Sequence, residues 1–319
     1  MVRITTLALL LAAVPLFVQS NHLLGLFIAV LFSAYLAQSW NILGGLCGQF
    51  SFGHAAFFGV GLYSSLILQV DFGWPAPLAL VSAAVAGAVT GLFVGFVSFR
   101  YGLRGSYFAL VTLAFAEILR MTASVVSFTG AGSGKYLPTR LGIEHLQFSK
   151  SGYFYFILVL FVLVHLLVLA IQNSRLGARF AAIREDEEAA SALGVDVFRY
   201  KMIAILISSA VAGVGGCFYG QYYFYTDPHI AFGAAVSIEM LLAPIIGGAG
   251  TLFGPIVGAV VLRVAAELGQ SLTGGVPGFN LILYGIMVIL IVRYMPDGLI
   301  GGLRRPWALM RRRPTATAG

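Results

Sequence analysis

Long apolar runs, separated by short polar segments, follow one another along nearly the whole chain. A helix that crosses a bilayer needs about 20 predominantly apolar residues. The third, eighth and ninth of the candidate runs are rich in Gly and polar residues, so they could be broken or re-entrant. We therefore expect an all-α polytopic membrane protein with eight to ten transmembrane helices. The ten candidate spans are 4–19, 22–42, 50–70, 76–99, 106–126, 153–172, 201–225, 231–249, 251–271 and 279–295.

Composition supports the same class of protein. The chain is 59% hydrophobic and 10% charged, with a mean hydropathy of +0.93, whereas soluble domains carry roughly 25% charged residues. The net charge of +7 comes from basic residues in loops and at the C-terminus, so it indicates membrane topology and not nucleic-acid binding. Cys47 and Cys217 lie in apolar or Gly-rich segments without a CxxC pair, and we interpret both as packing residues.

The N-terminal 20 residues have the features of a signal peptide: Arg3, an apolar core and then a small residue. Another apolar segment follows almost at once, so we favour an uncleaved first span. Cleavage is the alternative, and it would leave the orientation of the other spans unchanged.

The distribution of Lys and Arg predicts the orientation. With the N-terminus inside, the outside loop 127–152 holds Lys135, Arg140 and Lys150. We thus expect both termini and the loop 173–200 in the cytoplasm, 127–152 in the periplasm, and 303–319 as a basic cytoplasmic tail. The whole chain, 1–319, is then one transmembrane domain. The inside loops and tail hold Arg100, Arg104, Arg175, Arg179, Arg184, Arg199, Lys201, Arg304, Arg305, Arg311, Arg312 and Arg313.

Two glycine-rich stretches, 48–61 and 247–261, have a similar pattern of glycines every few residues, with a hydroxyl and aromatic residues between them. They lie at comparable places in the two halves of the chain. Many transporters are built from internal repeats, but Gly is common in all membrane helices. The sequence leaves a true repeat open.

The segment TGAGSGKY, 129–136, partly resembles a phosphate-binding loop. The pattern G-x-x-x-x-G-K-[ST] requires Gly at position 129 and a hydroxyl ligand for magnesium at 136. Thr129 and Tyr136 stand there instead. We therefore expect an ordinary flexible outside loop, and no nucleotide site in this chain.

Ser51 and His54 lie three positions apart in a predicted span, which would place them on one helical face. They could line a polar substrate path, or they could belong to close helix packing with one hydrogen-bonded histidine. No second His or carboxylate lies at ligand spacing, so a metal site is not expected.

Glu117 and Glu239 are the two acids within predicted spans. An ionisable group at membrane depth is a functional hypothesis by default, and the alternative is a structural hydrogen bond to a neighbouring helix. Arg120 follows Glu117 by three residues, so a local ion pair is possible. Arg263 and Glu267, four apart, are expected to form a structural pair.

Hydrolytic chemistry finds little support. The chain has no H-E-x-x-H motif and no G-x-S-x-G elbow. The other histidines, which have no partner at useful sequence spacing, are His22, His145, His165 and His229.

The stretch AAIREDEEAASALGVD, 181–196, lies between two apolar segments and holds five of the twelve acidic residues. We predict a short helix over 184–193, with an i,i+4 pair from Arg184 to Glu188 and Gly194 as its stop. It could insert into a groove of a partner or lie as a solvated surface helix. Its thin apolar stripe comprises Ile183, Ala190, Leu193 and Val197.

Over residues 35–302 the chain resembles the permease subunits of ABC importers for branched-chain and other hydrophobic amino acids, most closely the M-type Liv permeases. One departure lies in the outside loop, where TGAGSGKYLP replaces the TGG-S-x-G type of many relatives. The motifs that carry the resemblance, in chain order, are GQFSFGHAAFFGVGLY (48–63), LRGSYFALVTLAFAEILR (103–120), NSRLGARFAAIREDEEAASALGVDVFRYK (173–201), SIEMLLAPIIGGAGTLFGPIVGA (237–259) and YMPDGLIGG (294–302).

This resemblance implies a permease of the bacterial inner membrane, paired with a second, homologous H-type permease. Two cytoplasmic ATPases, which bind ATP and magnesium, and a periplasmic binding protein would complete the importer. The chain itself would hold no cofactor and no catalytic residue. A substrate path would run near Ser51, His54, Glu117 and Glu239.

The resemblance also implies a role for the acidic stretch. Glu188, Ala189, Ala190 and Gly194 match the E-A-A-x-x-x-G core of the coupling helix that docks on the ATPase. The residues expected to couple to the ATPase are Arg184, Glu185, Asp186, Glu188, Ala189, Ala190 and Gly194.

Three alternatives remain. A transporter of the same family could carry urea, amides or aromatic acids. An ion-coupled secondary transporter could use Glu117 or Glu239 to carry protons. A membrane-embedded enzyme could use His54 with a carboxylate, but the chain shows no nucleophile or metal set for it.

Overall fold

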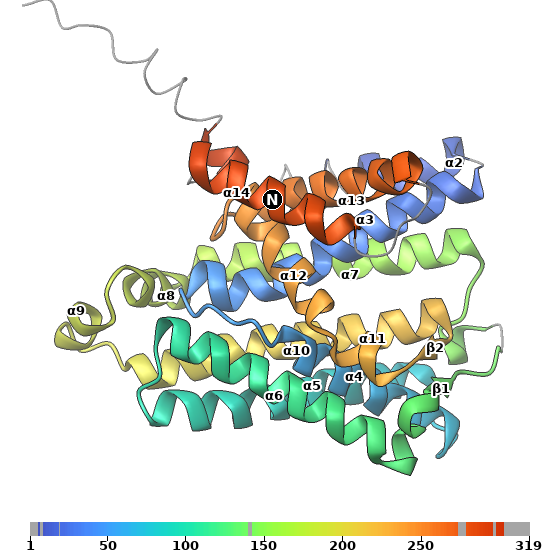
Figure 1. Cartoon of the computed structure of the whole chain (residues 1–319), viewed down its shortest axis with the longest axis horizontal. Helices are drawn as coiled ribbons and strands as arrows, with labels where there is room; N and C mark the ends of the chain where they lie inside the picture. The colour runs from blue at the N-terminus through green and yellow to red at the C-terminus, as the bar shows by residue number, and fades with distance from the viewer. Residues whose placement is uncertain are drawn as a thin grey trace, which may run out of the picture.

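The computed structural model describes residues 6, 9–18, 20–139, 142–273, 279–295 and 298–302. Within them the chain is built almost wholly of helices (Figure 1), which confirms the predicted all-α membrane class. The longer elements are α3 (Asn21–Trp40), the π-helix η1 (Asn41–Leu46), α4 (His54–Val70), α5 (Ala76–Arg100), α6 (Gly105–Val125), α7 (Lys150–Gln172), α10 (Val197–Tyr223), α12 (Ala234–Gly247), α13 (Gly254–Thr273) and α14 (Phe279–Tyr294). The shorter helices are α2 (Val14–Phe17), α8 (Arg175–Glu185), α9 (Glu187–Ala192) and α11 (Pro228–Phe232).

Six helical segments of the described chain are long and apolar enough to cross a membrane. The three spans that the sequence marked as irregular all depart from one continuous helix. The third begins only at His54, the eighth is divided at Gly233 into α11 and α12, and the ninth begins after a loop at 248–253. The six segments are Asn21–Leu46, Ala76–Arg100, Gly105–Val125, Lys150–Gln172, Val197–Tyr223 and Pro228–Gly247.

Two predicted segments touch the limits of the described residues. Of the first predicted span, 4–19, the structure describes residue 6 and residues 9–18, with α2 inside them. The basic tail 303–319 lies outside the described residues.

Glycines bring the backbones of α4, α5 and α10 into direct contact. A Cβ atom built on Gly213 of α10 would lie 2.3 Å from the Ala83 carbonyl oxygen of α5. One on Gly216 would lie 2.2 Å from the Phe58 carbonyl oxygen of α4. Such close approach is typical of membrane helix packing. Small residues let the backbones come together, and van der Waals contact takes the place of the hydrophobic driving force available in water. Helix α10 is therefore the centre of a tightly packed group.

The arrangement of the helices separates two polar ends (Figure 1). Helices α8 and α9 project at one end, while the strands β1 (Lys135–Tyr136) and β2 (Tyr225–Thr226) lie at the opposite end. Helix α12 contacts α3, α13 and α14 on one side and α4 on the other. The polar segments thus lie where the apolar helices terminate.

The segment expected to be an ordinary flexible loop has regular structure. It contains the 3₁₀ turns η2 (Ser127–Thr129) and η3 (Ala131–Ser133), and β1 pairs antiparallel with β2. Lys135 forms an ion pair with Asp71, and its ammonium also donates to the Phe128 carbonyl at 3.1 Å. Pairing with a distant part of the chain, which local sequence does not reveal, explains the difference.

Candidate functional site

The acidic stretch forms two helices, so the prediction of one helix over 184–193 is wrong. Helix α8 ends at Glu185, Asp186 is extended (φ −159°, ψ 116°), and α9 begins at Glu187. The break separates Arg184 from Glu188, and the predicted pair between them does not form. Arg184 contacts Glu185 at 3.2 Å, and Glu188 contacts Arg104 at 3.0 Å.

Asp186 causes the break because it caps the second helix. Its carboxylate accepts hydrogen bonds from the backbone amides of Glu188 at 2.8 Å and Ala189 at 3.0 Å. Aspartate is among the strongest N-cap residues, since it satisfies amides that the first helical turn leaves free. The Asp-Glu-Glu order was the sequence signal for this cap, and the acids of the first turn also suit the helix dipole.

We expect Asp186→Ala to fray α9 and Asp186→Asn to preserve it, because asparagine retains a cap oxygen. The amides of Ala189 and Glu188 lower the pKa of the Asp186 carboxyl. A lowered folded-state pKa means that the cap is complete above the unfolded pKa and is lost as pH falls through the folded one. Hydrogen exchange of residues 187–192 at neutral pH should therefore rise in Asp186→Ala alone. Equal exchange in both variants would contradict the cap.

The end of α9 agrees with the prediction. Gly194 adopts a left-handed conformation with φ +86°, and its amide donates to the Ser191 carbonyl at 2.9 Å. The next amide, of Val195, donates to the Ala190 carbonyl at 3.0 Å. These bonds form a Schellman-type stop, for which glycine is the favoured residue.

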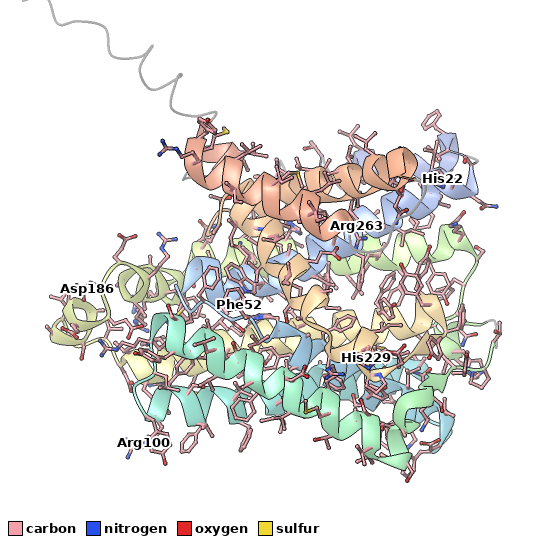
Figure 2. The ribbon with its side chains drawn as sticks, in the orientation of Figure 1. His22, Phe52, Arg100, Asp186, His229 and Arg263 are labelled. Carbon is pink, nitrogen blue, oxygen red and sulfur yellow. The ribbon has the colours of Figure 1, made fainter. Side chains whose placement is uncertain are left out.

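Helices α8 and α9 have one buried face and one bare face. Phe180, Ile183 and Ala190 are at most 2% exposed, and they pack with apolar residues of η1, α5, α6 and α10. The Glu188 side chain on the other face is 82% exposed. Leu193, which the sequence placed in the apolar stripe, caps the end of α9 and is instead 85% exposed. Figure 2 shows Asp186 at the projecting end of the molecule. The unit is anchored from beneath and presents its outer face to a binding partner or solvent.

Glu187, which the sequence did not single out, holds α9 in place. Its carboxylate accepts from Gln49 Nε2 at 3.0 Å, lies 3.0 Å from Arg104 Nε, and forms an ion pair with Lys201. The Glu187 side chain is 15% exposed and that of Lys201 is 5% exposed. Sequence spacing did not reveal this role, because Leu193 lies at the same three-residue distance from Ala190 and is exposed.

Beneath this unit, buried amides of α3 and η1 bind the loop between α12 and α13. Gln38 Nε2 donates to the Leu252 carbonyl at 2.7 Å. Asn41 accepts from the Gly250 amide at 2.8 Å and donates to the Thr251 carbonyl at 3.1 Å. Residues 41–46 form a π-helix at this point, a feature that often marks functional sites. The second glycine-rich stretch therefore contacts the helix that precedes the first one, and the origin of the two stretches as a repeat stays a prediction.

Arg184 connects α8 to the same junction. Its guanidinium donates to the Gly45 carbonyl at 3.1 Å, and Gln172, at the end of α7, donates to the Gly250 carbonyl at 3.1 Å. Gly250 has φ +76°, and a Cβ atom there would lie 2.7 Å from the Gly45 carbonyl oxygen, so glycine is required for this approach. Movement of α8 would thus act directly on the π-helix and on the 248–253 loop.

Ser51 and His54 are joined, although not on one helical face, because Ser51 precedes the first residue of α4. The Ser208 hydroxyl donates to the Ser39 carbonyl at 2.6 Å, so its oxygen accepts from His54 Nε2 at 2.8 Å. The other ring nitrogen, Nδ1, accepts from the Ser51 hydroxyl at 3.0 Å. Ser51 and His54 are both 0% exposed. Their contacts make a closed network with every ring nitrogen satisfied.

Replacing Ser208 by Ala is expected to destabilise the protein by about 1–3 kcal/mol, because the buried His54 N–H would lose its acceptor. Ser82→Ala is the matched control, since the Ser82 hydroxyl donates only within its own helix, to the Ala79 carbonyl at 2.7 Å. Thermal denaturation of the two purified variants measures the difference. Equal midpoints would show that this hydrogen bond contributes little.

Glu117 and Arg120 form the predicted local ion pair, with Nε of Arg120 donating to the carboxylate at 2.9 Å. The same guanidinium lies 3.1 Å from Nδ1 of His229, where α11 meets α6 (Figure 2). Sequence spacing indicated no partner for His229, because this contact joins residues 109 positions apart. Glu117 is 46% exposed at its side chain and Arg120 is 20% exposed.

The predicted pair of Arg263 with Glu267 is wrong. Arg263 instead forms an ion pair with Glu239 across the contact of α12 with α13, and Ser33 also donates to Glu239 at 2.9 Å. Glu267 lies 3.2 Å from His22. Helix α12, which contacts α13, places a carboxylate closer to Arg263 than its own helix does. Figure 2 shows His22 and Arg263 on the helices of this side.

A cavity of 550 Å³ adjoins the Glu239–Arg263 pair. Its wall carries charged residues of both signs, including Lys150, Glu267 and His22. Among the described residues, no group of three His, Cys, Asp or Glu side chains is arranged to hold a metal. The arrangement suits polar or zwitterionic groups.

Comparisons with known proteins agree with the architecture. The family described as "Branched-chain amino acid transport system / permease component" matches residues 22–292. The high-affinity branched-chain amino acid transport system permease protein LivM of Salmonella typhimurium is 29% identical over 290 residues, covering 83% of this chain and 67% of that relative. The corresponding permease LivH of Escherichia coli is 25% identical over 288 residues, covering 84% of this chain and 91% of that relative.

A more distant relative is the probable branched-chain amino acid transport permease protein LivM of Methanocaldococcus jannaschii. It is 24% identical over 238 residues, covering 70% of this chain and 67% of the relative. No solved structure matches the chain. Because the family match covers most of the chain, this multi-pass membrane protein belongs to the permease component family of branched-chain amino acid transport systems.

Proposed function

We propose that this chain is one permease subunit of an ABC importer in the bacterial inner membrane. Its substrate would be a branched-chain or related hydrophobic amino acid. The family match supports this proposal, as do the names of relatives, which describe high-affinity branched-chain amino acid permeases of two kinds, LivM and LivH. A second, homologous permease would complete the membrane part, and a periplasmic binding protein would deliver the substrate.

In this proposal α9 docks on a cytoplasmic ATPase, which binds ATP and magnesium. The observation that carries it is the contrast between the two faces of α9: a base fixed by Glu187 and Ala190, and an exposed face with Glu188 and Leu193. A short helix that inserts into a groove needs both properties. Asp186 and Gly194 fix its two ends, while Arg184 and Glu185 flank it.

ATPase closure would reach the membrane helices through α8. Arg184 and Gln172 bind the junction of the π-helix with the 248–253 loop, so a displacement of α8 would act on both α3 and α13. Discrete rearrangement of packed elements is the usual way in which a local contact produces a large change. The end with α8 and α9 would then lie in the cytoplasm with both termini, and the end with residues 127–152 in the periplasm.

The substrate path is proposed near Glu117 and Glu239, which both have exposed side-chain surface. Ser51 and His54 would act on the path only indirectly, since both are fully buried in their own network. Charged groups at membrane depth face a bundle interior or a water-filled cavity in most membrane proteins. Affinity would reside mainly in the binding protein.

Mild detergent purification of the tagged chain from its native host tests the proposal. We expect two ATPases and a second permease to co-purify, and reconstituted uptake to require ATP and the binding protein. A chain that purifies alone and transports in liposomes on a proton gradient without ATP would instead establish an ion-coupled transporter. Uptake competition among branched-chain amino acids, urea, amides and aromatic acids then identifies the substrate class.

A further inference from the structure

The exposed face of α5 is apolar along its length, as expected for a helix that faces lipid. Its exposed positions recur every three or four residues, which is the period of one helical face. Such a stripe needs no protein partner within a bilayer. The exposed large side chains are Leu78, Val81, Val85, Val89, Phe93 and Phe96.

The exposed face of α6 differs because an ion pair interrupts it. Glu117 lies among exposed apolar residues of this helix, and its side chain is itself 46% exposed. It precedes the end of α6 at Val125 by eight residues, or about 12 Å at 1.5 Å per residue. The apolar residues of this face are Tyr107, Leu110, Leu113, Ile118 and Met121.

Internal contacts do not remove this charge from the surface. Arg120 donates to both carboxylate oxygens of Glu117 and lies 3.1 Å from His229 of α11, yet the Glu117 side chain stays nearly half exposed. The pair Glu239–Arg263 is less exposed, at 26% for each side chain, and adjoins a cavity. Hydrocarbon is a poor solvent for an exposed ion pair, so the α6–α11 face requires protein and water against it.

We propose that the face of α6 and α11 carrying Glu117, Arg120 and His229 binds the second permease subunit, and that a water-filled path runs beside Glu117. This inference rests on the proposed function. The chain is similar to relatives named LivM and to relatives named LivH, so two such subunits would share one fold. Subunits with one fold can pack through equivalent faces around an approximate twofold axis, which would place the charged clusters on either side of a common path.

Site-specific photo-crosslinking in the intact complex tests the interface. A benzophenone amino acid is placed at Ile118 of α6 or, as a control, at Val81 of α5, which are 57% and 58% exposed. We expect an adduct with the second permease from Ile118 and none from Val81. An adduct with that permease from Val81 alone, or only lipid adducts or a second copy of this chain at Ile118, would overturn the inference.

Thiol labelling tests the water path separately. Met121→Cys and Val81→Cys place thiols at positions that are 56% and 58% exposed, and the native Cys47 and Cys217 are both buried. A water-soluble, membrane-impermeant thiol reagent should label Met121→Cys at least about tenfold faster, because it reacts with thiolates. Equal rates would contradict a path beside Glu117.

These outcomes are separable from failure of the proposed function. If no second permease co-purifies with the unmodified chain, the importer proposal fails before any crosslink is formed. If it co-purifies but contacts α5, only the position of the interface is wrong.

Discussion

Replacing Glu187 by Ala is expected to destabilise the protein by about 3–5 kcal/mol, because it leaves the buried Lys201 ammonium without its counter-ion. Lys201 is buried and pairs with Glu187, and Arg104 contacts the same carboxylate. Breaking a buried pair from one side costs more than the pair itself contributes. The midpoint of thermal denaturation in detergent, and the amount of assembled complex, should both fall.

Two variants make this expectation specific. Glu188→Ala removes a carboxylate that is 82% exposed and also contacts Arg104, and such exposed pairs contribute only about 0–1 kcal/mol. The double variant Glu187→Met with Lys201→Met removes both buried charges, so it should regain much of the lost stability. Equal midpoints for Glu187→Ala and Glu188→Ala would show that Glu187 does not anchor α9.

Replacing Leu193 by Asp is expected to reduce ATP-driven uptake about tenfold or more while leaving the fold intact. Leu193 is 85% exposed at the end of α9, so a polar side chain is tolerated in the free chain. A central apolar anchor of an interface contributes enough that its loss exceeds the 1.4 kcal/mol of a tenfold change in binding. Uptake by reconstituted complexes and recovery of the ATPase with the tagged chain measure the effect.

Tyr101→Asp provides the control for this second variant. Tyr101 is 79% exposed and follows α5 at the same end of the molecule, but it does not belong to α9. We expect normal denaturation midpoints for both variants and a loss of uptake in Leu193→Asp alone. Normal uptake by Leu193→Asp would count strongly against docking through this face.

Apolar periodicity predicted the long helices and the irregular membrane spans, but not the break between α8 and α9. The candidate spans 76–99 and 106–126 correspond to helices at Ala76–Arg100 and Gly105–Val125. A long apolar segment must satisfy its own backbone in a bilayer, so helix is the main solution available. The break at Asp186 depends on a side chain that competes for two amides, and the hydropathy of the segment carries no trace of that competition.

Local pairs were similarly easier to predict than distant ones. Glu117 and Arg120 lie one helical turn apart, so their sequence spacing alone indicated the contact. Spacing also suggested Arg263 with Glu267, but α12 places Glu239 beside Arg263. The partners of a charged residue within a bundle depend on which helices become neighbours, and one sequence does not specify this.

The bonds between α3 and the 248–253 loop have a consequence for synthesis of the chain. Asn41 and Gly250 are 209 positions apart, and the carbonyl to which Gln38 donates lies 214 positions later in the chain. During translation, therefore, α3 enters the membrane long before the acceptors and donor of its buried amides exist. Nascent helices must keep those amides hydrated or temporarily paired, because an unsatisfied polar group in hydrocarbon costs several kcal/mol. We expect a ribosome-bound chain truncated before residue 250 to hold α3 incompletely packed and sensitive to protease. The packing of α3 would be completed once the 248–253 loop has left the ribosome.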